Sequence, residues 1–305
     1  MNRMVFTADG GGERIDVFLN KRIPDFSRSY LQKLIKNGCV NVNGKSVKSS
    51  CRLVVDDIIA IEIPDNVKPD IRPEPIPLDI LYEDNDLLVV NKPKGMVVHP
   101  AAGHYSGTLV NALLYHCDSC LSGINGVLRP GIVHRIDRDT TGSLLICKND
   151  MAHQALARQL KDHTVNRRYR AIVWGQLSKD QGTIDAPIGR HSTDRKKMAI
   201  NYKNGKNAVT HYQVLQRFSS FTYIECRLET GRTHQIRVHM ASLGHPLLGD
   251  TVYGPSKSPF HHLEGQCLHA MTLGFMHPRT GTYIECAAPL PEYFEVLLDK
   301  LQKNT

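Results

Sequence analysis

Four charged residues within a span of five offer the clearest chemistry in this chain of 305 residues. They are Arg135, Asp137, Arg138 and Asp139, and they lie within GIVHRIDRDTTGSLLICKN at residues 131–149. The apolar runs GIV and LLI predict two buried strands, so we expect the charged loop between them to open onto a cleft. A carboxylate beside guanidinium groups stays ionised and is available as a nucleophile or a base. A surface loop with paired charges is the alternative, and the residues alone favour neither.

An aromatic side chain stands among cations farther along the chain. Tyr169 lies within Arg167-Arg168-Tyr169-Arg170, at the start of an expected strand that continues to residue 174. Aromatic rings among cations serve to stack an unpaired base beside its phosphates. A tyrosine at a sheet edge with solvated arginines is the alternative reading.

A third polar segment, ETGRTHQIRVHMASLGHPLLGD, predicts a helix over residues 232–243. Two arginines, Arg232 and Arg237, and two histidines, His234 and His239, lie on it. The histidines are five positions apart rather than four, which favours a structural role over metal binding.

These segments carry a family resemblance. HRIDRDTTG resembles the HRLDxxTSG motif of the RluA family of RNA pseudouridine synthases, with Ile136 and Thr141 where the family has Leu and Ser. NKPKGMVVHP, RRYRAIVWG and ETGRTHQIRVHMASLGHPLLGD resemble further motifs of that family. The resemblance covers nearly the whole chain and is closest to the RluD type, which modifies large-subunit ribosomal RNA.

The resemblance implies a role for each of several residues. Asp137 would be the catalytic group, which either attacks or deprotonates the ribose, and Arg237 would form an ion pair with it. Arg232 is a second guanidinium near enough to be considered for that ion pair. Tyr169 would stack on the target base, and Arg135 would help hold the RNA with the target nucleotide out of the stack. The implied fold is α+β: a catalytic domain on a mixed, mainly antiparallel sheet that follows an S4 module.

Residues 14–63 are expected to form that small module, with Ser27 as the N-cap of a helix and Asn43-Gly44 as the turn of a hairpin. Between Lys21 and Arg52 there are eight basic residues and one acid, Asp25, as on a phosphate-binding face, although a solvated basic face is the alternative. The run SRSYLQKLIKNGCVNVNGKSV resembles an S4 RNA-binding domain, which favours RNA over DNA as the partner. The RNA-binding residues expected there are Arg28, Lys33 and Lys36.

Five prolines between residues 64 and 77 predict an extended linker. We therefore divide the chain into an S4-like domain with its linker, residues 1–75, and a catalytic domain, residues 76–305.

The stretch GRHSTDRKKMAINYKNGK, residues 189–206, predicts a hairpin with six basic residues and Asp194 as its one acid. Its apolar residues at alternate positions are Met198, Ile200 and Tyr202. A comparable loop closes over the RNA in the family, and a flexible surface hairpin is the alternative. The RNA-binding residues expected in this hairpin are Arg195, Lys196 and Lys197.

Composition agrees with an RNA partner. The net charge is +8 and the pI is near 9.0, which favours an acidic partner such as nucleic acid, although a merely basic protein is the alternative. The N-terminus lacks the apolar region of a signal peptide, and no apolar run approaches a membrane span. We expect a cytoplasmic monomer without membrane contact and with ribosomal RNA as its partner, from a large-subunit stem-loop or a pre-ribosomal particle.

No cofactor or metal is expected. The pair Cys117 and Cys120 is one C-x-x-C without a second matching pair, and no Walker A or GxGxxG sequence follows a strand. Uridine isomerisation consumes no electrons, groups or water. A non-catalytic RNA-binding ribosome-assembly factor is the main alternative function, and an RNA N-glycosylase or nuclease is another.

Overall fold

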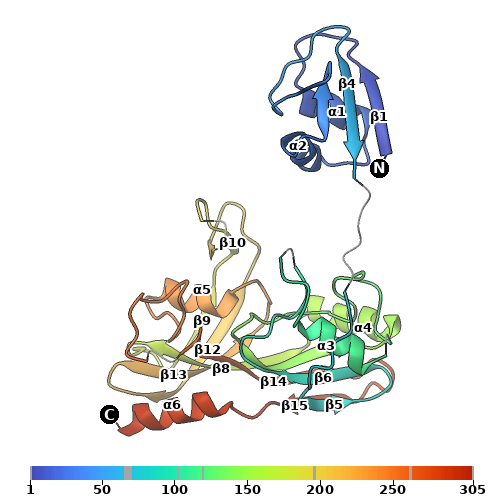
Figure 1. The fold of residues 1–305 in the computed structure, drawn as a ribbon. Coiled ribbons are helices and arrows are strands. Elements are labelled where there is room, and N and C mark those ends of the chain that lie inside the picture. The colour runs from blue at the N-terminus through green and yellow to red at the C-terminus, as the bar shows by residue number, and fades with distance from the viewer. Residues whose placement is uncertain are drawn as a thin grey trace. The chain divides into compact units, whose positions relative to one another are not determined.

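The computed structural model of the protein describes residues 2–64, 71–101, 103–118, 120–194, 197–260 and 263–303. Contacts divide the chain into two compact units, Met1–Lys68 and Pro69–Thr305, and each is described by itself (Figure 1). Within these described ranges, no helix is both long and apolar enough to cross a bilayer.

The first unit packs two helices on a small antiparallel sheet. The strand order is β1-β4-β2-β3. The elements are β1 Asn2–Thr7, α1 Ile15–Arg22, α2 Arg28–Lys36, β2 Val40–Val42, β3 Lys45–Ser46 and β4 Ile58–Ile63. The Ser27 side chain accepts a hydrogen bond from the Tyr30 N–H at 3.3 Å, which confirms the predicted cap of α2. Asn43 and Gly44 both have positive φ, as the predicted hairpin requires.

The second unit is built on one nine-stranded sheet with the order β5-β6-β7-β14-β8-β13-β12-β9, and β15 also pairs with β14. The strands are β5 Ile80–Glu83, β6 Leu87–Lys92, β7 Thr141–Cys147, β8 Asn166–Trp174, β9 Gln181–Asp185, β12 Val209–Arg217, β13 Phe221–Leu228, β14 Leu268–Met276 and β15 Tyr283–Ala287. β7 and β14 run parallel, and the other described pairs are antiparallel. The predicted mixed, mainly antiparallel sheet is confirmed.

Helices cover this sheet, and a hairpin extends from it. The remaining elements are α3 Leu109–His116, α4 Asp150–Lys161, α5 Gln235–Ser242, α6 Glu292–Lys303 and the hairpin strands β10 Ile188–Arg190 and β11 Met198–Ile200. Figure 1 shows α3 and α5 on one side of the sheet and α6 on the other. The largest core lies beneath α3 and α5, where Leu113 and Met240 pack in one buried cluster with Leu144. The β10–β11 pairing confirms the predicted hairpin. Tyr202, which was expected on the apolar face of this hairpin, is instead 81% exposed.

The second half of the predicted linker packs on the catalytic unit. Ile71 and Leu78 lie against the largest core. The Glu74 N–H donates to the Asn111 carbonyl at 3.0 Å, and the Glu74 carboxylate accepts from the Gly107 N–H. Contacts thus separate the units between residues 68 and 69, while the division at residue 75 stays a prediction.

One predicted strand is wrong. Residues 131–133 make only an isolated bridge, between Ile132 and Ile146, whereas the run at 144–146 lies in β7 as expected. Gly131 has a left-handed φ of 69°, and a Cβ there would lie 2.6 Å from the Cys147 carbonyl oxygen. This turn removes the chain from the sheet and leads it into the charged loop.

Candidate active site

The charged loop before β7 is anchored by a buried lysine. Lys92 is fully buried, and its Nζ donates to the carbonyls of Pro93, Met96 and Arg138 at 2.7, 3.0 and 2.9 Å. Burial lowers the pKa of Lys92 to about 7, against the attraction of nearby Asp139 and Asp137. Lys92 thereby ties the turn after β6 to the backbone that follows Asp137.

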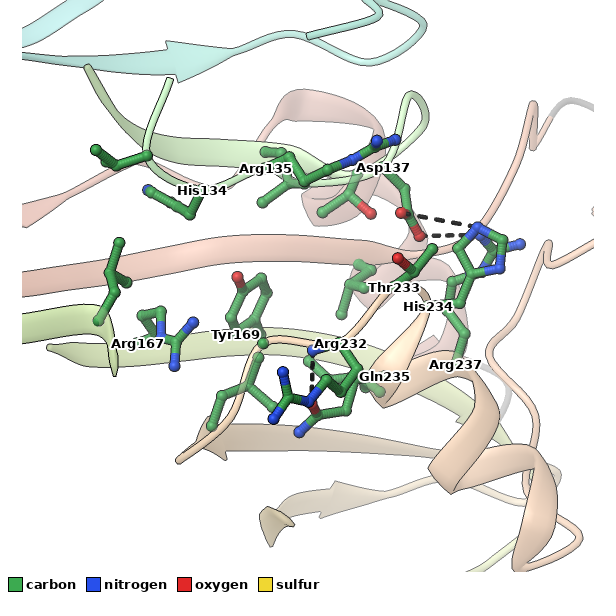
Figure 2. A pocket seen from close by; sticks show the side chains of 18 of the residues that line it. His134, Arg135, Asp137, Arg167, Tyr169, Arg232, Thr233, His234, Gln235 and Arg237 are labelled. Carbon is green, nitrogen blue, oxygen red and sulfur yellow. Dashed lines mark hydrogen bonds and ion pairs between the residues drawn. The ribbon is translucent and has the colours of Figure 1, made fainter. Parts of the chain in front are cut away.

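Arg237 joins two carboxylates at this loop. Its Nη1 donates to Asp137 Oδ2 at 2.9 Å, and its Nε and Nη2 donate to the two oxygens of Asp250 at 2.6 and 2.9 Å. Burial would lower the pKa of Arg237, but Asp250 and Asp137 raise it overall. The predicted partners Asp137 and Arg237 therefore meet, from the loop and from α5 (Figure 2). The charge-assisted hydrogen bond from the guanidinium fixes the position of the Asp137 carboxylate.

Tyr169 lies on the central strand β8, between β14 and β13. Its side chain is buried against the core, and it lines the same pocket as Asp137. Burial raises the pKa of the Tyr169 hydroxyl, which keeps it protonated. Its arginine neighbours Arg168 and Arg170 both pair with Glu225, at 3.2 and 3.1 Å.

Strand alternation separates the arginines of the RRYR run into two groups. Arg167, two positions before Tyr169, lines the pocket with it. Arg168 and Arg170 do not line that pocket. Of the three arginines beside Tyr169 in the sequence, Arg167 alone shares its pocket, because successive side chains of a strand point to opposite faces.

The pocket that contains these groups has a volume of ≈ 540 Å³ and is polar on several sides. Its lining includes Arg135, Asp137, Tyr169, Arg237, His234 and Arg167. This volume lies in the range of small-ligand sites and suits a single flipped nucleotide base. Figure 2 shows Tyr169 between Arg167 on one side and Asp137 on the other.

The comparison with known proteins decides the family. Residues 86–242 match the family model for RNA pseudouridylate synthase, and residues 13–59 match that of the S4 domain. The chain belongs to the RNA pseudouridylate synthase family. The matched segment contains Asp137, Tyr169 and Arg237, together with every other residue that lines the pocket except Leu268.

Relatives from the pseudouridylate synthase family cover the whole chain. A Bacillus subtilis protein described as an uncharacterized RNA pseudouridine synthase is 55% identical over 100% of both chains. The ribosomal large subunit pseudouridine synthase D of Zymomonas mobilis is 50% identical over 98% of this chain and 97% of its own. The solved structure of human RNA pseudouridylate synthase domain containing 1 is 27% identical, with a TM-score of 0.57 over 74% of this chain and 95% of that one.

Other predicted site residues occupy different environments. Arg135 is exposed at the pocket, and its Nη1 lies 3.4 Å from His99 Nε2. Arg232 has a different hydrogen-bond partner from Arg237. Its Nε donates to the Asn207 carbonyl at 2.9 Å. The ion pair with Asp137 is thus made by Arg237, and Arg232 serves to hold the turn before α5.

The predicted RNA-binding residues of the first unit differ from one another. Lys33 and Lys36 are exposed on α2. Arg28 is also exposed, but its Nε and Nη2 each lie 3.0 Å from Oδ2 of the fully buried Asp16. Arg28 therefore has a structural role in this unit as well as any role in binding.

In the hairpin, Arg195 and Lys196 lie outside the described residues. Lys197 directly precedes β11, and its N–H donates to the Asp194 carbonyl at 3.1 Å. The hairpin is joined to the pocket through Tyr253, whose hydroxyl accepts from the Met198 N–H and lies 2.8 Å from His234 Nδ1.

Sequence reasoning missed three groups beside Asp137. Asp250 holds Arg237, Lys92 holds the loop backbone, and His234 Nε2 lies 3.8 Å from Asp137 Oδ1. His234 itself has a left-handed φ of 57°, which only a few per cent of non-glycine residues adopt. Asp250 and His234 both stand in the third motif, so their polar side chains in that segment were the available signal.

A separate cluster of Asp84, Asp86 and His277 has the composition of a metal site. Its atoms are already bonded by protein donors: Arg279 donates to both oxygens of Asp86, and His277 Nε2 lies 2.8 Å from Asp84 Oδ2. The cluster is therefore a structural link between the end of strand β14 and the turn before β6.

Proposed function

We propose that this protein isomerises uridines of large-subunit ribosomal RNA to pseudouridine, with Asp137 as the catalytic group. The observation that carries the proposal is the ion pair of Asp137 and Arg237 beside Tyr169 in one base-sized pocket. The relatives named ribosomal large subunit pseudouridine synthase D, 50% and 46% identical, support the choice of RNA.

The reaction breaks the bond from ribose C1′ to uracil N1 and forms one from C1′ to C5. The proton at C5 is lost and N1 gains one, so atoms and electrons balance without a cofactor. Asp137 begins the reaction by attack on the ribose or by removal of a ribose proton. In either case it must be correctly oriented toward the ribose, and the charge-assisted hydrogen bond from Arg237 orients it.

The target base must leave its stack before it can enter the pocket, which costs a few kcal/mol in a duplex. Tyr169 is placed to receive the base on its ring, and stacking of this kind contributes about 1–3 kcal/mol per base. Arg135, exposed at the pocket, would hold the RNA in the opened conformation.

Cations outside the pocket would position the RNA. We assign phosphate contacts to Lys33 and Lys36 of α2, with Arg28 beside them, and to Arg195, Lys196 and Lys197 of the hairpin. Contacts of this type set the register of the RNA and do not read its sequence. The RNA substrate would then be a ribosomal stem-loop whose target base enters the pocket and whose phosphates contact these cations.

Mapping pseudouridines in ribosomal RNA from cells with and without the gene tests this proposal. The expected result is the loss of specific large-subunit pseudouridines, which return with the wild-type gene. An unchanged map would contradict the assigned activity. Release of free uracil or cleavage of the RNA by the purified protein would support the N-glycosylase or nuclease alternative instead.

A further inference from the structure

Arg167 is a buried cation that no carboxylate neutralises within the described part of the chain. It is 5% exposed and lines the pocket beside Tyr169. Its Nη2 donates to the Glu229 carbonyl at 2.8 Å, while its Nε is buried without a hydrogen-bond partner among the described residues. A buried donor left without an acceptor costs roughly 1–3 kcal/mol, so such a group calls for an explanation.

The chain makes room for this guanidinium. A Cβ at Gly231 would lie 2.6 Å from Arg167 Nη1. Gly231 therefore allows the turn before α5 to cover Arg167 closely and hold it against the pocket wall. Two elements therefore fix the position of the Arg167 guanidinium: the turn at Gly231 and the central strand β8, from which the side chain extends.

His134 lines the pocket with Arg167 and has a fixed tautomer. Its Nε2 accepts a hydrogen bond from the Leu145 N–H at 3.1 Å. A backbone N–H can only donate, so Nε2 is the unprotonated nitrogen and Nδ1 carries the hydrogen. Burial, with help from the charge of Arg167, lowers the pKa of His134 to about 3. His134 is thus a neutral donor near neutral pH.

Arg167 and His134 lie on the side of Tyr169 away from Asp137 in Figure 2. A base stacked on Tyr169 with its ribose at Asp137 would direct its far edge toward these two side chains. Both can only donate from the atoms that remain available. The wall accordingly suits a base that carries an acceptor at each end of its far edge, as uracil does with O2 and O4 on either side of N3–H.

We propose that Arg167 and His134 form a donor-only wall that binds the uracil carbonyl oxygens O2 and O4 and selects uracil over cytosine. This inference rests on the proposed function and identifies the chemistry of its substrate recognition. Cytosine has an amino group in place of O4, and that donor would face another donor. A phosphate is a poorer occupant, because an anionic backbone would have to leave water to reach a cation buried this deeply.

The same wall suits both substrate and product. Turning the ring over so that C5 takes the place of N1 exchanges O2 with O4. The two acceptors then occupy the same positions as before the turn. Donors at these positions would hold the base in both orientations, with no acceptor group on the wall to favour one of them.

The test compares RNA stem-loops that carry uridine, cytidine or pyrimidin-2-one ribonucleoside at the target position; the last lacks O4 and, like cytidine, has an acceptor N3 where uridine has N3–H. Dissociation constants are measured with the Asp137→Asn protein, which binds without reaction. The parent is expected to prefer uridine to pyrimidin-2-one, and Arg167→Met is expected to reduce that preference by roughly 10- to 100-fold, the range for a hydrogen bond to a charged group. Arg167→Lys keeps the charge without the planar fork and is expected to fall between them.

Arg168→Met is the matched control, because Arg168 is the next residue of β8, pairs with Glu225 and does not line the pocket. It should leave the base preference unchanged.

Gly231→Ala should reproduce the Arg167→Met effect by displacing the guanidinium. Equal weakening for all three RNAs with a flatter salt dependence would show a phosphate contact and overturn the wall, as would an unchanged preference. If Arg167→Met does not fold, the preference of Arg167→Lys for uridine over the other two nucleotides decides the test. Pseudouridine formation by the wild-type protein is measured in parallel, so that failure of the wall and failure of the activity are distinct results.

Discussion

Asp250 holds Arg237 from the side opposite Asp137. Both oxygens of the buried Asp250 carboxylate accept from Arg237, at 2.6 and 2.9 Å, which leaves Nη1 for Asp137. Burial would raise the pKa of Asp250, but Arg237 lowers it overall, so Asp250 stays ionised. The guanidinium therefore has one orientation, and that orientation presents a donor to Asp137.

Asp250→Asn should reduce kcat without a matching rise in KM. The amide keeps the shape but can accept at only one atom, so Arg237 would turn toward Asp137 or away from it. A misplacement of about 1 Å near the reacting atoms can cost on the order of 10²-fold in rate. Steady-state kinetics on a ribosomal stem-loop measures the effect. Wild-type kcat in this variant would show that Asp250 does not position Arg237.

Replacements of Tyr169 separate the ring from the hydroxyl. Tyr169→Phe keeps the stacking face and should retain RNA affinity, with a slower reaction if the hydroxyl moves a proton. Tyr169→Ala should be worse than Phe by roughly 1–3 kcal/mol of stacking free energy. Affinity and kcat are measured for both variants. Identical behaviour of Phe and Ala would exclude stacking as the role of this ring.

The S4-like unit should contribute to the salt dependence of RNA binding. Lys33→Ala and Lys36→Ala remove exposed cations of α2, and for single-stranded RNA the log–log salt slope should flatten by about 0.7 for every phosphate that is no longer neutralised. Arg28→Ala makes an instructive comparison, because it also leaves the buried Asp16 without one of its partners. It should lower stability as well as affinity. If the variant with both lysines replaced keeps the wild-type salt slope, Lys33 and Lys36 do not contact phosphates of the RNA.

Acid should destabilise the protein partly through His99. Burial lowers the pKa of His99 to about 4, from about 6.5 in the unfolded chain. The unfolded state then binds more protons between these values, so stability is lost as pH falls from 6.5 toward 4. For this one group the loss should be about 2 kcal/mol between pH 7.5 and pH 5. Urea denaturation at the two pH values should show a smaller loss for His99→Gln, and an equal loss would exclude His99 as a source.

Local sequence signals predicted much of the first unit and part of the site. The Ser27 cap, the Asn43-Gly44 turn and the positions of Asp137 and Tyr169 each depend on residue types within a few positions. The pair of Arg237 with Asp137 came from family resemblance, since it joins residues 100 positions apart.

Other features depend on packing that short stretches do not encode. Lys92 reaches Arg138 across 46 positions, and a lysine in a polar NKPKG turn gives no sign that it will be fully buried. The run at 131–133 has the composition of a strand, but Gly131 turns it out of the sheet. The face of Arg167 could have been predicted, because alternation along the expected strand places it with Tyr169.

The most direct test of the account is pseudouridine formation by purified Asp137→Asn beside Asp139→Asn on the same ribosomal transcript. Both changes remove one carboxylate charge from the same loop, but only Asp137 contacts Arg237, whereas Asp139 pairs with Arg138. Loss of a covalent catalytic group can cost up to ~10⁶-fold. We predict no detectable pseudouridine with Asp137→Asn, near-normal RNA binding in both variants, and substantial activity with Asp139→Asn. Substantial pseudouridine formation by Asp137→Asn would contradict the assignment of Asp137 as the catalytic group.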